Sequence, residues 1–152
     1  MGLIERQYYR RETASLLAPA SAIVELDESQ VHGIAKRLVD TFVPDKGFTA
    51  FVLSTGYGYW LEAQDNCTWL VTCGDPQPGD AGQRKHWFWE ARLQVSRHSD
   101  LAAAQAMVEF RPTRWRETRD KEFVRKRAYK AFRERLLAEL QAASPTFAQV
   151  SA

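Results

Sequence analysis

The segment from Arg111 to Arg135 is the part of the sequence best suited to binding an anion. It contains 11 lysines and arginines against 4 acidic residues, whereas the rest of the chain has 10 basic and 15 acidic residues. Cationic side chains that neutralise phosphates release counterions, so such a segment predicts contact with a nucleic-acid backbone. The candidate phosphate-binding residues are Arg111, Arg114, Arg116, Arg119, Lys126, Lys130 and Arg133.

A long helix from near Thr118 to Ala143 is predicted to hold most of these cations. Its four basic candidates share one stripe at helical spacing: Arg119, Lys126, Lys130 and Arg133. About a quarter-turn away runs an apolar stripe, which predicts the docking face: Ala128, Tyr129, Phe132, Leu136 and Leu140. The alternative is an ordinary solvated helix, because a Glu122–Lys126 pair at i, i+4 fits simple helix stabilisation.

The second candidate surface is aromatic and centres on Tyr57 and Tyr59 in the stretch STGYGYWLE. The residues AQDN at 63–66 predict a four-residue hairpin loop, which would place Trp60 opposite Trp69. Side chains alternate between faces along a strand. We therefore expect the core face to carry Trp60, Trp69, Val71 and Cys73, joined from the next strand by Trp87, Trp89 and Leu93. The tyrosines would lie on the other, half-wet face, which Phe88, Arg92 and Gln94 would extend.

The run Gly56, Tyr57, Gly58 and Tyr59 partly resembles the aromatic motif of RNA-recognition domains, Lys/Arg-Gly-Phe/Tyr-Gly/Ala-Phe/Tyr-Val-x-Phe/Tyr. The resemblance covers four residues and implies that the tyrosines stack on bases. Thr55 replaces the basic residue, Glu62 replaces the last aromatic, and a strand follows where that family has a helix. Two alternatives stay open, namely tyrosines packed on a two-sided sheet and a protein-binding patch.

The elements that would position these residues predict an α+β fold. An amphipathic helix is expected to begin after the capping residue Asp27, with Gln30 completing a capping box, and to end at Pro44. Its apolar stripe is Val31, Ile34, Ala35, Leu38, Val39 and Phe42. Strand patterns occur at 21–26, 48–54, 56–62, 67–74, 86–95 and 104–112, the last stopping at Pro112.

Consecutive strands joined by short turns predict an antiparallel meander. We expect a sheet of four to five strands, flanked by the N-terminal amphipathic helix and the long basic C-terminal helix. Residues 1–143 would form a single domain and residues 144–152 a flexible tail.

The sequence gives little sign of catalysis, so a non-enzymatic protein without cofactor or metal is expected. His32, His86 and His98 are scattered, with His32 on the polar face of the first helix. The two cysteines, Cys67 and Cys73, are too few for a zinc site, and we expect both to be reduced thiols. Cys67 is expected to face the core. The residues VPDK at 43–46, combined with Glu90 and Arg92 or with Glu109 and Arg111, distantly match a nuclease pattern in which arginine replaces the tunable lysine.

The chain of 152 residues has no apolar run of membrane-spanning length and no secretion signal, so we expect a cytoplasmic protein without a membrane partner. The predicted function is nucleic-acid binding with little sequence preference. One alternative is a protein-interaction module, an adaptor or inhibitor that binds an acidic partner such as a nucleic-acid-processing complex. The third possible function is that of a small nuclease or hydrolase. Homodimerisation is left open.

Overall fold

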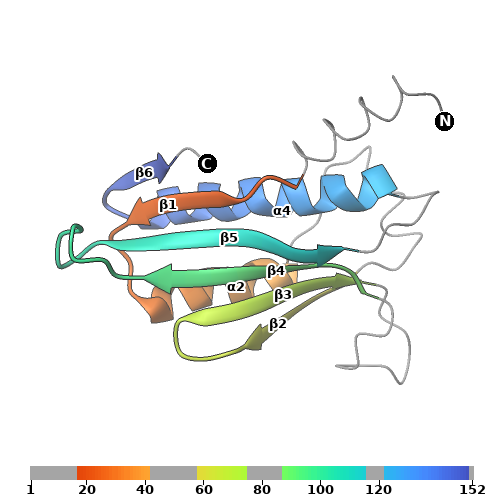
Figure 1. The fold of residues 1–152 in the computed structure, drawn as a ribbon, viewed down its shortest axis with the longest axis horizontal. Coiled ribbons are helices and arrows are strands. Elements are labelled where there is room, and N and C mark those ends of the chain that lie inside the picture. The colour runs from red at the N-terminus through yellow and green to blue at the C-terminus, as the bar shows by residue number, and fades with distance from the viewer. Residues whose placement is uncertain (1–16, 42–57, 75–86, 116–121, 151–152) are drawn as a thin grey trace.

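The computed structural model describes residues 17–41, 58–74, 87–115 and 122–150 (Figure 1). These residues form two helices and six strands. In chain order they are β1 (Ala20–Val24), α2 (Glu28–Thr41), β2 (Gly58–Ala63), β3 (Thr68–Gly74), β4 (Trp87–Ser96), β5 (Ala106–Trp115), α4 (Glu122–Ala143) and β6 (Phe147–Val150).

The six strands form one antiparallel sheet in the order β2-β3-β4-β5-β1-β6. The predicted α+β class and the β2–β5 meander are confirmed, but the sheet has six strands instead of four or five. The strand pattern at 48–54 lies outside the described residues.

The added strand, β6, lies in the segment that we expected to be a flexible tail. Ser144 Oγ accepts a hydrogen bond of 2.8 Å from the Glu25 amide just after β1, which returns the chain to the sheet. Phe147 then packs against the core. A side-chain contact 119 residues away in sequence thus orders a segment whose composition predicts fraying.

Both helices cover the same face of the sheet (Figure 1). The α2 stripe is buried as predicted at Val31, Ile34, Ala35 and Leu38. The apolar stripe predicted for α4 is likewise buried at Ala128, Tyr129, Phe132, Leu136 and Leu140. We call the opposite side of the sheet the helix-free face, because neither α2 nor α4 packs against it.

The capping box that begins α2 is confirmed. The Gln30 amide donates to Asp27 Oδ1 at 2.8 Å, and the Asp27 amide donates to Gln30 Oε1 at 2.9 Å. These bonds satisfy amides that have no partner inside the helix.

We therefore expect Asp27→Ala to lower the free energy of unfolding by about 0.5–2 kcal/mol. Urea denaturation followed by circular dichroism measures this loss. Asp40→Ala, which removes an exposed carboxylate near the other end of α2, is the control. An equal effect of the two substitutions would contradict the capping role.

The predicted register of the β2–β3 hairpin is wrong. Trp60 lies opposite Thr72 instead of Trp69, and Tyr59 lies opposite Cys73. The connecting loop is 64–67, one residue later than expected, because Asp65 Oδ1 accepts a hydrogen bond of 2.9 Å from the Cys67 amide and fixes the turn there. The Thr68 carbonyl closes the turn by accepting hydrogen bonds from the Gln64 and Asp65 amides, so Ala63 pairs with Trp69 and the register moves by three residues. An odd shift exchanges the two faces of β2.

Pro112 does not end β5, which continues to Trp115. The register with β4 shifts between Glu90 and Ala91, so that Pro112 pairs with Ala91 and Arg114 with Glu90. Thr113, the extra residue, donates its hydroxyl to the Glu90 carbonyl at 3.1 Å. A bulge tolerates a proline because the ladder is already interrupted there.

Candidate nucleic-acid interface

Three arginines gather on the helix-free face of β4 and β5. Arg92 lies directly opposite Arg111, and Arg114 lies two positions further along the face, opposite Glu90. Strand alternation places them there, because Ala91 and Leu93 on either side of Arg92 are fully buried beneath the helices. Arg111 and Arg114 were predicted as anion-binding residues, and the structure brings both next to Arg92.

An aromatic side chain lies on the same face at the β2 edge. One row across the strands runs Trp60, Thr72, Glu90 and Arg114, and the adjacent row runs Glu62, Leu70, Arg92 and Arg111. Trp60 is half-buried and therefore retains accessible surface. With strands about 4.8 Å apart, its backbone lies roughly 10 Å across the sheet from the Arg92 strand.

The three arginines differ in their partners. Arg114 forms an ion pair of 3.2 Å with Glu90, whose side chain is only 10% exposed and also accepts a hydrogen bond from Thr113. Arg111 lies 3.8 Å from Glu109, a long contact, and remains 57% exposed. Arg92 is exposed and makes no ion pair or hydrogen bond with any described residue. Arg92 is thus the most available cation of this face.

The structure describes one of the two aromatic candidates predicted from the sequence, Tyr59, and it does not line this surface. Tyr57 lies outside the described residues. Tyr59 is on the core face, where its ring stacks on Phe132 at 5.4 Å and contacts Trp89 at 6.0 Å. The placement of Tyr59 on a half-wet face is therefore wrong, and the register shift explains it. The same shift brings Trp60 to the helix-free face, where the sequence analysis missed it.

The basic stripe predicted for α4 is described only in its second half. Lys130 lies 3.9 Å from Glu134, and Arg133 donates to the Ala18 carbonyl at 2.6 Å while lying over the Tyr129 ring. Arg133 therefore helps to anchor the chain ahead of β1. Arg116, Arg119 and the side chain of Lys126 lie outside the described residues.

Tyr129 completes this anchor beneath β1. Its hydroxyl donates to the same Ala18 carbonyl at 3.2 Å. Burial raises the pKa of the Tyr129 phenol well above its usual range, more than the nearby Arg133 charge lowers it. The phenol accordingly stays neutral and serves as a hydrogen-bond donor.

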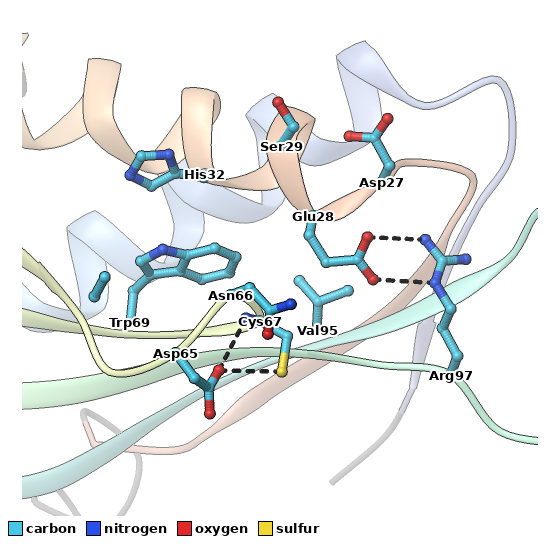
Figure 2. Close-up of a pocket in the computed structure, with 11 residues that line it drawn as sticks. Asp27, Glu28, Ser29, His32, Asp65, Asn66, Cys67, Trp69, Val95 and Arg97 are labelled. Carbon is cyan, nitrogen blue, oxygen red and sulfur yellow. Dashed lines mark hydrogen bonds and ion pairs between the residues drawn. The ribbon is translucent and has the colours of Figure 1, made fainter.

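A separate open cleft of about 880 Å³ lies between the start of α2 and the β2–β3 loop (Figure 2). The His32 ring stacks on Trp69 with centroids 5.4 Å apart, so His32 is half-buried, contrary to the expectation for a polar helix face. Glu28 forms an ion pair of 3.0 Å with Arg97 across the cleft.

Cys67 lies in the loop at the edge of this cleft instead of facing the core (Figure 2). Its thiol donates to Asp65 Oδ1 at 3.2 Å, and this bond raises the pKa of the thiol. A raised pKa disfavours the thiolate that nucleophilic chemistry needs. Within the described part of the chain, no group of three or more His, Cys, Asp or Glu side chains could hold a metal ion.

No helix among the described residues is long and apolar enough to cross a membrane. No protein-family model, curated protein or solved structure matches this chain.

Proposed function

We propose that the protein binds single-stranded nucleic acid across the helix-free face of its sheet, without chemistry and with little sequence preference. The observation that carries this proposal is the direct opposition of Arg92 and Arg111 on neighbouring strands. Like charges that face each other across a sheet are destabilising. A phosphate placed between two guanidinium groups would remove that repulsion and accept hydrogen bonds from both.

The position of Trp60 favours a single strand over a duplex as the ligand. Bases in a single strand are free to stack on an aromatic ring, and each stacked base contributes about 1–3 kcal/mol regardless of its identity. A base on Trp60 and a phosphate on Arg92 and Arg111 would lead one strand diagonally past half-buried Leu70, because Thr72 and Glu90, which lie between Trp60 and Arg114, are themselves buried. Stacking and phosphate contacts carry little sequence information, in agreement with the expected low preference.

The helix-free face differs from the site expected on α4, where Arg133 is engaged with the Ala18 carbonyl. Arg111 and Arg114 are common to the expected set and the proposed one. In the proposal, α4 contributes at most additional phosphate contacts outside the sheet.

An interaction module that binds an acidic protein is the second candidate. The observation that favours it is the interleaving of carboxylates with the arginines, since Glu62, Glu90 and Glu109 lie on the same face. An acidic protein can place individual basic side chains beside these carboxylates, whereas a nucleic-acid backbone, which is uniformly negative, cannot. Oligonucleotide binding separates the two candidates, because the second predicts none.

Trp60 provides the experiment for the proposed function. Trp60→Ala should weaken the binding of a fluorescein-labelled single-stranded oligonucleotide by about 1–3 kcal/mol in an anisotropy titration. Trp60→Phe, which keeps an aromatic ring, should retain most of the affinity. Equal affinities of wild type, Trp60→Ala and Trp60→Phe, with unchanged circular dichroism spectra, would exclude stacking at this position.

A further inference from the structure

Strand β6 forms one edge of the sheet (Figure 1). It pairs with β1 on one side, and no described strand lies on its other side. The edge is held in place, because Ser144 tethers the preceding turn to Glu25 and Phe147 packs against the core. Its outer amides and carbonyls are therefore presented in an ordered extended conformation.

This edge has no charge and no proline within the strand, two of the features that normally prevent strand pairing. Its one protective feature of this kind is its short length of four residues, which limits how strongly it can pair. The sequence of β6 is FAQV, and no charged residue occurs anywhere from Leu140 to Ala152, although 26% of the chain is charged. Val150, 36% exposed, is also the single exposed large hydrophobic side chain among the described residues.

We infer that β6 pairs with β6 of a second copy of this chain, which would join two sheets into one. If the two-fold axis is perpendicular to the sheet, the helix-free faces of both copies lie on the same side of the joined sheet. In an antiparallel pair this requires that one residue of β6 lies opposite the same residue of the second copy. Centring on Gln149 places Ala148 opposite Val150 of the second copy. Both side chains then lie on the helix-free face, where Ala148 is paired with Ile23.

The charge pattern favours a second copy as the occupant, because an uncharged edge meets its own image without repulsion. Four residues bury much less than the roughly 800 Å² per partner of a standard interface. The dimer should therefore be weak, and its population should rise with protein concentration.

Sedimentation velocity over a range of protein concentrations tests the inference. The wild-type protein should move from its monomer mass of 17.4 kDa towards twice that mass as concentration rises. Val150→Lys should remain monomeric throughout, because two lysines would meet near the axis. Gln64→Lys, which adds the same charge in the exposed β2–β3 loop, should behave like wild type. Unchanged thermal melts would show that neither substitution acts through folding.

Cross-linking tests the register. In a Cys67→Ser background, Gln149→Cys should form an intermolecular disulfide on mild oxidation, because opposed residues lie about 4.5–5.5 Å apart at Cα. Gln141→Cys, exposed on α4, should not. A wild-type monomer at all concentrations, a Val150→Lys variant that associates normally, or equal cross-linking at the two positions would overturn the inference. None of these outcomes depends on nucleic-acid binding.

Discussion

Replacement of Trp89 by alanine is expected to lower the free energy of unfolding by about 3–5 kcal/mol. Trp89 is 1% exposed and lies at the centre of an aromatic cluster beneath α4. Its ring centroid is 5.3 Å from that of Tyr129 and 6.0 Å from those of Phe132 and Tyr59. The truncation would leave a cavity that these rigid rings cannot readily fill. Urea denaturation monitored by circular dichroism would measure the loss.

Trp60→Ala is the matched control for the stability measurement. The substitution removes the same side chain from the helix-free face, where Trp60 is half-buried and outside this cluster. Its effect on stability should be clearly smaller. If the two alanine variants lost the same stability, Trp60 would be part of the core and the observed β2 register would be contradicted.

Much of the fold could be predicted because local sequence determined it. The side chains of Asp27 and Gln30 cap the first turn of α2, so these two residues alone indicate where the helix begins. The spacing of Val31, Ile34 and Leu38 indicates which face of α2 is buried. The alternation around Trp89 likewise assigned the faces of β4. Strand β6 could not be predicted, because the hydrogen bond from Glu25 to Ser144 is a tertiary contact.

The faces of β2 were assigned wrongly because one loop decided them. The side chain of Asp65 places the turn one residue later than the sequence AQDN suggests. The sequence also gives no sign that the Thr68 carbonyl closes the turn. Trp60 and Tyr59 therefore exchanged their expected environments.

The candidate site was predictable only in part, because it too depends on strand register. Arg111 and Arg114 stood out by charge, and alternation placed Arg92 on the face away from the core. The opposition of Arg92 and Arg111 depends on the pairing of β4 with β5, including the shift at Glu90. Local sequence does not determine this register. The composition of the basic segment alone therefore placed the predicted binding site on α4.

The double variant Arg92→Gln/Arg111→Gln should lose most of its affinity for single-stranded oligonucleotides. Hydrogen bonds to charged groups contribute about 1.5–3 kcal/mol each, so each lost guanidinium should weaken binding about tenfold or more. Because Arg92 and Arg111 share one phosphate in this proposal, their loss should also reduce the magnitude of the salt slope by about 0.7. Because the variant relieves a like-charge pair, stability should stay equal or rise. Anisotropy titrations and thermal melts measure these effects.

Lys130→Gln/Arg135→Gln removes the same charge from α4 and is the matched control. Each of these residues pairs with a glutamate four positions along the helix. Its affinity should stay close to that of wild type. A larger loss in this variant than in the sheet variant would move the binding surface to α4.

The most direct test of the central claim is a titration of the wild-type protein with a single-stranded oligonucleotide at several salt concentrations. One phosphate shared by Arg92 and Arg111 and a second at Arg114 should give a slope of log affinity against log salt of about −1.4, from about −0.7 for each phosphate. Binding that is tight at low salt and falls with this slope agrees with a phosphate backbone on the helix-free face. Absence of binding even at low salt would contradict nucleic-acid binding by this protein.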